Sequence, residues 1–249
     1  MMEDSPRAPE DTSTDAVRPV RADGEQSRER LRQAALVLFA QQGFSKTSTR
    51  EIAEAAQTNV AAISYYFGDK AGLYRAVFAA PRDDIGVLLN HLADAALPLE
   101  QALKAVLRGF IEPLREGDMA RHCMKLHMRE MLEPTGLWEE EIRDGIAPQH
   151  AALVRVLSLH LGLARADDEV HRLAISIAGL GVHLHVGHEV IEVLAPRLNR
   201  GARALDDWSD RLVMYALAMV EAERLRRAQQ APAVRGAARR AGVKGSKTP

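Results

Sequence analysis

The chain has 249 residues, enough for one or two domains with a substantial core. Its 33 basic and 34 acidic residues give a formal net charge of −1. This balance excludes a protein that binds nucleic acid over its whole surface, but it is compatible with one basic face on one domain. The single cysteine, Cys123, excludes an internal disulfide and indicates a reducing compartment. Ala and Leu are abundant and no segment alternates as a strand does, so the sequence predicts an all-α fold.

Residues 1–25 are rich in Asp, Glu, Pro, Ser and Thr and have no periodic apolar stripe. This composition predicts a disordered acidic arm. The segment lacks the apolar core of a secretory signal, and no apolar run reaches membrane-spanning length. We therefore expect a cytoplasmic protein that has no membrane partner.

Residues 26–80 predict three short helices and a fourth at 70–80. The first has apolar residues at helical spacing and is closed by Gly43; its stripe is Leu31, Ala34, Ala35, Leu38 and Phe39. A capping box formed by Ser48 and Glu51 begins the second helix, and Asn59 can cap a third at 60–67. Two short helices joined by a tight turn are typical of a helix-turn-helix unit.

The third helix has a surface suited to the major groove of DNA. It carries small side chains that allow close approach, followed by groups that can bond phosphate oxygens. The capped helix N-termini would direct partial positive charge at the DNA backbone. The predicted DNA-binding residues are Thr47, Ser48, Thr49, Arg50, Asn59, Ala61, Ala62, Ser64, Tyr65, Tyr66 and Lys70. The pattern alone leaves an ordinary helical hairpin with solvated caps as the alternative.

Residues 27–80 resemble the DNA-binding domain of the TetR family of bacterial transcriptional regulators. The resemblance is carried by Gly43, Phe44, Thr47, Ser48, Ile52, Ala53, Ala56, Ile63, Tyr65, Tyr66, Phe67, Lys70, Leu73 and Tyr74. It implies a phosphate contact at Lys70. The family commonly has tyrosine and histidine where this chain has Ser64 and Tyr66, which weakens the same implication at those two positions.

Residues 81–229 predict a larger helical domain for ligand binding and dimerisation. The expected helices are 84–96, 99–116, 119–133, 137–161 with a kink at Pro148, 169–194, and 208 to about 229. Residues 230–249 carry basic residues and no acids, and they predict a disordered tail.

The last two long helices are apolar on more than one face, and the earlier of them is rich in small residues. A helix of this kind needs a second packing partner, so we expect a homodimer that joins these helices in a four-helix bundle. The TetR resemblance implies the same dimer. The sequence Arg-Glu-Met-Leu-Glu-Pro at 129–134, with residues 82–220 around it, also resembles the effector domain of the CecR-like branch of the family.

Two histidine groups could bind a metal ion, and they support an alternative function as a metal-dependent α-helical enzyme or a metal sensor. The first group is His183, His185, His188, Glu189 and Glu192, and the second is His122, Cys123 and His127. For the first group we favour polar side chains at a helix interface or pocket wall. For the second we favour a packed thiol with two partly exposed imidazoles. The sequence has no catalytic constellation and no phosphate-binding glycine loop, so we expect neither enzymatic activity nor a cofactor.

Residues 119–133 carry four methionines, which can form an adaptable apolar lining, although such a stripe more often belongs to the core. The predicted ligand-binding residues are Phe110, Met124, His127, Met128, Met131, Trp138 and His183. We expect a small organic effector, uncharged or weakly acidic, between helices 119–133 and 169–194. The predicted function is a repressor that such an effector releases from a palindromic, double-stranded operator.

Overall fold

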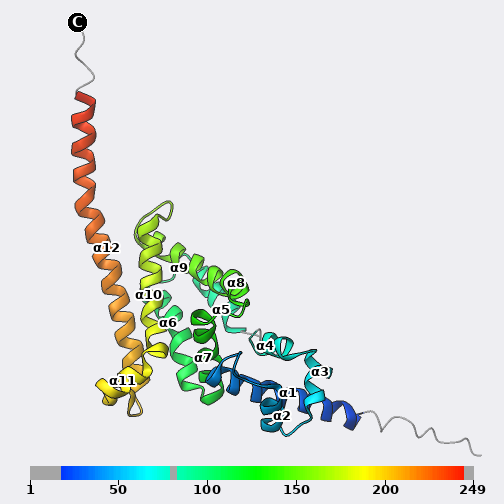
Figure 1. Ribbon diagram of the computed structural model, residues 1–249. Helices are drawn as coiled ribbons and strands as arrows, with labels where there is room; N and C mark the ends of the chain where they lie inside the picture. The colour runs from blue at the N-terminus through cyan, green and yellow to red at the C-terminus, as the bar shows by residue number, and fades with distance from the viewer. Residues whose placement is uncertain (1–17, 79–82, 244–249) are drawn as a thin grey trace, which may run out of the picture. The chain divides into compact units, whose positions relative to one another are not determined.

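The structure is a computed structural model that describes residues 18–78 and 83–243, with side chains for 23–78 and 86–230. Over these ranges the chain forms helices and turns and no strand, which confirms the all-α prediction. Its contacts divide it into an N-terminal unit, Met1–Ala80, and a C-terminal unit, Pro81–Pro249 (Figure 1).

The N-terminal unit contains four helices packed around one core. They are α1 (Arg18–Gln42), α2 (Thr49–Ala55), α3 (Val60–Phe67) and α4 (Lys70–Phe78). The fully buried Leu31 and Phe39 of α1 meet Ile52, Ile63 and Leu73 from the other three helices. The predicted disordered arm is wrong for residues 18–25, which belong to α1, and residues 1–17 lie outside the described part of the chain.

Local hydrogen bonds set the helix ends in this unit. Gly43 closes α1 with a φ of 83°, and its N–H donates to the Phe39 carbonyl at 2.9 Å. Ser48 and Glu51 form the predicted capping box of α2, and the Asn59 side chain caps α3. These short-range bonds fix where α1 ends and where α2 and α3 begin.

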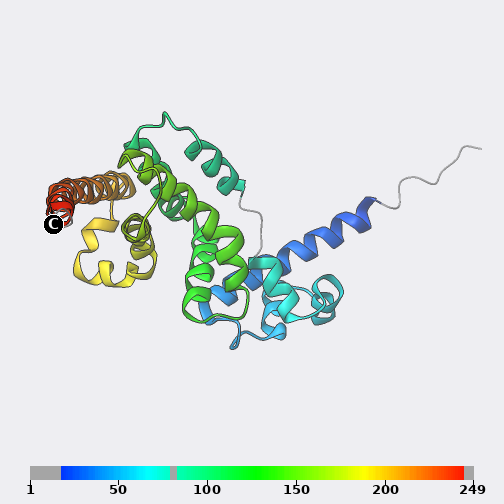
Figure 2. The ribbon, with the colours of Figure 1, turned by 90° about the horizontal axis from the view of Figure 1, so that it is seen from above.

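The C-terminal unit is a layered helical domain (Figures 1 and 2). Its elements are α5 (Asp83–Leu92), α6 (Leu99–Arg115), α7 (Asp118–Leu132), α8 (Trp138–Glu140), η1 (Glu141–Ile146), α9 (Ala147–His160), α10 (Asp168–Val186), α11 (His188–Leu194), η2 (Pro196–Asn199) and α12 (Ala204–Val243). The core lies between α6, α9, α10 and α12, where Leu107, Leu157, Ile177 and Ala216 are fully buried. Figure 2, which shows α12 nearly end-on, places this helix at the edge of the unit.

Several expected segments differ from the structure. The expected helix 84–96 ends at Leu92, and the last helix begins at Ala204 instead of 208. The expected helix 137–161 is divided by the π-helical turn η1. The expected helix 169–194 ends at Val186, and α10 meets α11 at a bend of 70°. A Cβ at the intervening Gly187 would lie 2.7 Å from the His183 carbonyl, so the chain needs glycine here. The predicted disordered tail is wrong for residues 230–243, which continue α12, and 244–249 lie outside the described residues.

Among the described helices, none alone has the length and apolar content to cross a membrane. Helices α10 and α11 have that length and apolar content only when the two are counted together across the bend between them.

Candidate nucleic-acid interface

Helix α3 turns one uncharged face toward solvent. Val60, Ala61, Ser64 and Tyr65 are exposed, with Tyr65 at 82 %, whereas Ile63 is buried in the core. The exposed positions recur at helical spacing, so they share one side of the helix. Ala62 is half-buried at the edge of this face. The predicted contacts Ala61, Ser64 and Tyr65 are therefore accessible to a groove.

At three predicted DNA contacts, the polar side-chain atoms form hydrogen bonds within the protein. Thr47 is 1 % exposed, and its hydroxyl donates to the Gly43 carbonyl at 2.8 Å, so this side chain is engaged within the protein and is not exposed for the predicted DNA contact. The Ser48 hydroxyl accepts from the Glu51 N–H at 3.2 Å, and the Asn59 Oδ1 accepts from the Ala61 N–H at 2.9 Å. These residues shape the helix-turn-helix rather than present free groups to DNA.

Glu51 completes the cap of α2. Its carboxylate accepts from the Ser48 N–H at 2.8 Å. This bond, followed by the bond with the Ser48 side chain, lowers the pKa of Glu51 below its ordinary value. The charged carboxylate is thus the form that holds the N-terminus of α2.

Lys70 holds the turn between α1 and α2. Its ammonium donates to the carbonyls of Phe44 and Thr47, both at 2.8 Å, and lies 4.4 Å from the centre of the Phe44 ring. Two of its three N–H groups are thereby occupied. The side chain is thus an internal clamp, and the phosphate contact that the family resemblance implies at Lys70 stays a prediction.

Other basic groups around α3 are more accessible. Lys46 is exposed, and no described residue forms a hydrogen bond or an ion pair with its side chain. Arg50 is highly exposed and pairs with Glu54 at 3.1 Å. Exposed ion pairs are weak, so a phosphate can replace the carboxylate partner. Lys46 was not among the predicted contacts, although its position two residues before the predicted cap of α2 was a usable signal.

The two tyrosines of α3 differ in environment. Their rings meet edge to face with centroids 4.8 Å apart. Tyr65 points outward, whereas Tyr66 is half-buried and its hydroxyl would lie 3.3 Å from a Cβ at Gly24 of α1. Tyr66 therefore packs α3 against α1. The remaining predicted contact, Thr49, is half-buried in the first turn of α2.

The predicted effector residues only partly share one region. Helix α7 packs against α6 and α10, as expected. The set includes the half-buried Phe110, Met124, Met128 and Trp138 and the buried His127, whereas Met131 and His183 are exposed. His127 Nδ1 lies 2.8 Å from the Cys123 carbonyl oxygen, and Nε2 lies 3.9 Å from the Glu141 carboxylate of η1.

The predicted metal seam does not form. The break at Gly187 places His188, Glu189 and Glu192 on α11, so they do not continue the face of α10. His185 Nε2 bonds the Phe110 carbonyl at 2.8 Å, and burial is the main cause that lowers the pKa of this histidine. Within the described residues, no three His, Cys, Asp or Glu side chains are placed to hold a metal ion.

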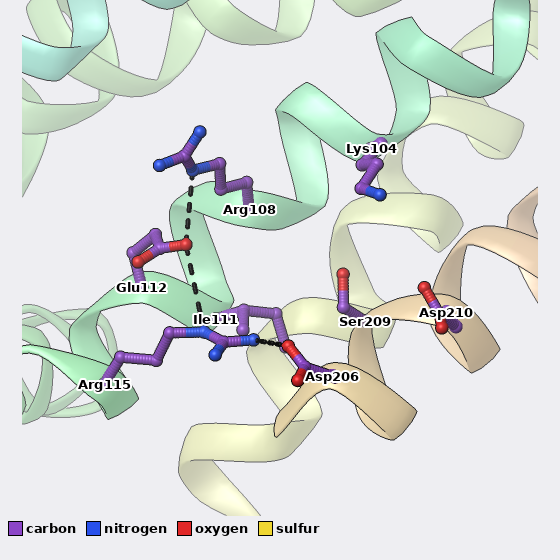
Figure 3. A pocket seen from close by; sticks show the side chains of 8 residues that line it. All are labelled: Lys104, Arg108, Ile111, Glu112, Arg115, Asp206, Ser209 and Asp210. Carbon is purple, nitrogen blue, oxygen red and sulfur yellow. Dashed lines mark hydrogen bonds and ion pairs between the residues drawn. The ribbon is translucent and has the colours of Figure 1, made fainter. Parts of the chain in front are cut away.

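A polar pocket of about 210 Å³ opens between α6 and α12 (Figure 3). It is lined by Lys104, Arg108, Ile111, Glu112, Arg115, Asp206, Ser209 and Asp210. Arg115 pairs with Asp206 at 2.5 Å, and Arg108 pairs with Glu112 at 3.2 Å. None of the predicted effector residues lines this pocket. The Arg115–Asp206 pair joins α6 to α12, whereas Arg108 and Glu112 pair within α6.

Comparisons with known proteins agree with this architecture. Residues 31–77 match the family model of bacterial regulatory proteins, tetR family, and residues 99–222 match the C-terminal domain of the HTH-type transcriptional dual regulator CecR. The chain is 30% identical over 201 residues to CecR of Shigella flexneri, with 76% of this chain and 87% of the relative covered.

Solved structures share the fold. HlyIIR, a hemolysin II transcriptional regulator, gives a TM-score of 0.55 at 21% identity, covering 77% of this chain and 97% of that chain. A regulatory protein of the tetR family from Rhodococcus RHA1 gives 0.57 at 18% identity, covering 78% and 96%. The matched relatives are regulators of transcription, in agreement with the expectation that the chain is not an enzyme. The chain belongs to the TetR family of DNA-binding transcriptional regulators and carries a C-terminal domain of the CecR type.

Proposed function

We propose that this regulator is a homodimeric repressor that binds a palindromic operator in the cytoplasm and leaves it when a small organic effector binds. The observation that carries the proposal is the exposed, uncharged face of α3 on a unit whose helix caps are internally satisfied. Two such helices, about 34–36 Å apart in a dimer, fit successive major grooves of B-DNA.

The proposed dimer surface consists of exposed apolar and small residues on α10 and α12. It contains Ile175, Gly179 and Val186 of α10 and Met214, Tyr215, Ala218 and Leu225 of α12. Along each helix these residues are spaced by three, four or seven positions, with Met214 and Tyr215 adjacent, so they share one side of the helix. Leu212, in contrast, is buried within the subunit core, so it does not belong to this surface. Pairing of two such surfaces would build a four-helix bundle about a two-fold axis.

Sedimentation velocity tests the dimer. We expect the wild type to be dimeric at micromolar concentration and Tyr215→Glu to be monomeric, because the dimer would bury an unpaired charge. Leu159→Glu is the matched control, since Leu159 is comparably exposed on α9, away from the proposed surface. A wild-type monomer, or equal effects of the two variants, would contradict this dimer.

Gel shifts and a reporter test the repressor. Duplexes from the DNA upstream of the protein's own gene are incubated with the protein, with a scrambled duplex as control. We expect a shifted complex on a palindromic segment only. A reporter driven by that segment should then be expressed less when the protein is present. Higher expression would identify an activator instead.

For the effector we propose a site where α7 meets η1. The residues that support it are the buried His127 and the half-buried Met124, Met128 and Trp138. The adjoining π-helical turn is further support, because such turns are frequent at functional sites. Apolar surface with one or two polar groups suits an organic molecule.

Thermal-shift screening of small organic molecules, followed by operator-release assays, tests this site. We expect Met128→Ala to alter the concentration at which an effector releases the operator while operator affinity stays nearly unchanged. Leu159→Ala is a control in the same unit, since Leu159 is exposed on α9 and belongs neither to the proposed dimer surface nor to the proposed effector site. An unaltered response of Met128→Ala would place the effector elsewhere.

A further inference from the structure

The exposed face of α3 lacks the side chains that form paired hydrogen bonds with bases. The helix has the sequence Val-Ala-Ala-Ile-Ser-Tyr-Tyr-Phe, without Arg, Lys, Asn, Gln, Asp or Glu. In the major groove, Arg and Lys pair with guanine, Asn and Gln with adenine, and carboxylates accept from cytosine. Helix α3 offers none of these pairs.

The polar groups beside this face do not replace the missing pairs. Asn59 could bond adenine through both side-chain atoms only by releasing its Oδ1 from the Ala61 N–H, which it caps at 2.9 Å. The Ser64 hydroxyl can donate or accept, so it distinguishes bases poorly. Tyr65 lies at the C-terminal half of the helix, whereas base contacts come mainly from the N-terminal residues of a recognition helix.

The groups that remain at the N-terminal half are methyl groups. Val60 is 43 % exposed, and the β-carbon of Ala61 lies on the exposed face beside it. The apolar group on the floor of the major groove is the C5 methyl of thymine. Small side chains also let the helix approach this methyl closely.

The charges that can attract phosphate lie outside α3. Lys46 precedes α2 and Arg50 belongs to its first turn, and both are exposed. Phosphate contacts position a protein on DNA without specifying sequence. The segment that begins α2 thus attracts the phosphates, and α3 selects the bases.

We propose that this regulator selects its operator through thymine methyl groups that pack against Val60 and Ala61, so that each half-site is rich in A·T pairs beneath α3. This inference rests on the proposed function, because it requires α3 in the major groove.

The test begins with selection of bound duplexes from a random pool by the full-length protein. Each thymine of the selected operator is then replaced by deoxyuridine, which removes the methyl group and keeps base pairing. At one or two thymines per half-site we expect about a fourfold rise in Kd, as for the exposure of one methyl-sized group. Substitution in both half-sites should give about fifteenfold.

Two variants assign the effect to α3. In Val60→Ala, replacing the thymine that Val60 contacts by deoxyuridine should raise Kd less than it does in the wild type. The reason is that the valine side chain and the thymine methyl group contribute to binding together. Val87→Ala is the matched control: Val87 is 70 % exposed on α5 of the C-terminal unit, and its truncation should leave every penalty unchanged.

The outcomes separate this inference from the proposed function. A specific operator that tolerates deoxyuridine everywhere would overturn the inference and leave the proposed function intact. A guanine beneath α3 whose replacement by 7-deazaguanine weakens binding would overturn it equally. A pool without any enriched sequence would overturn the proposed function itself, and the inference with it.

Discussion

Replacement of Lys70 by alanine distinguishes an internal clamp from a phosphate contact. The ammonium donates to the Phe44 and Thr47 carbonyls, both at 2.8 Å. A hydrogen bond to a charged group contributes about 1.5–3 kcal/mol, and the ring contact adds about 0.5–1 kcal/mol. Because the site is half-buried, water can replace part of this, so we expect Lys70→Ala to lower the unfolding free energy of the N-terminal unit by about 2–4 kcal/mol.

The two units can be followed separately during thermal unfolding. Both tryptophans, Trp138 and Trp208, belong to the C-terminal unit, so their fluorescence reports that unit alone. Far-ultraviolet circular dichroism reports both units. For Lys70→Ala we expect a circular-dichroism transition about 10 °C or more below that of the wild type, with the tryptophan transition unchanged.

Lys46→Ala is the matched control, since Lys46 is exposed and has no side-chain partner among the described residues. It should leave both transitions in place and reduce the slope of log K against log salt by about 0.9 for each phosphate that the Lys46 ammonium neutralises. A Lys70→Ala variant that melts as the wild type does and shows the reduced salt slope instead would identify Lys70 as a phosphate contact and not as a clamp.

Three further predictions concern the fold. A Cβ at Gly181 would lie 2.4 Å from the Phe110 ring, so Gly181→Ala should cost about 1–2 kcal/mol in urea unfolding, whereas Gly109→Ala, with open space around it, should gain up to about 1 kcal/mol. Gln57 has a φ of 52°, a conformation that is strained for residues other than glycine. Gln57→Gly should therefore increase the unfolding free energy by about 0.5–1 kcal/mol and raise the melting temperature. A lower melting temperature would mean that the Gln57 side chain makes a stabilising contact. Because the pKa of His185 is lowered, the folded state binds its proton more weakly than the unfolded state; the stability that the neutral ring contributes is complete above pH about 6.5 and falls as the pH drops through the folded pKa. His185→Gln should remove this part of the acid sensitivity, as measured by urea unfolding at pH 7.5 and 5.5.

Helix ends with local hydrogen bonds could be predicted from the sequence. The caps at Ser48 and Asn59 depend on groups within three residues of each. A stretch of four consecutive residues therefore includes every group that takes part in the cap. The bounds of α3 matched the prediction for the same reason. The role of Lys70 could not be predicted in this way, because its partner carbonyls lie 23 and 26 residues away in the chain.

The break after α10 shows a second limit of local patterns. Gly179, Gly181 and Gly187 lie in one apolar segment, yet the helix ends only at the last of them. Gly181 is required by the Phe110 ring of α6, a contact that no spacing within the segment reveals. The metal interpretation depended on an unbroken helix, so it failed at the bend after Val186, which divides the predicted seam between α10 and α11.

The internally bonded caps of the helix-turn-helix have a kinetic consequence. Since Ser48 and Lys70 already hold the segment between α1 and α2, and Asn59 already caps α3, association with DNA requires ordering only of exposed side chains such as Lys46. Encounter rates should then follow the electrostatic attraction of the duplex and vary little between sequences. Discrimination between operators would lie in the lifetime of the complex, and a dissociation-rate measurement on each sequence would rank them as well as a full titration.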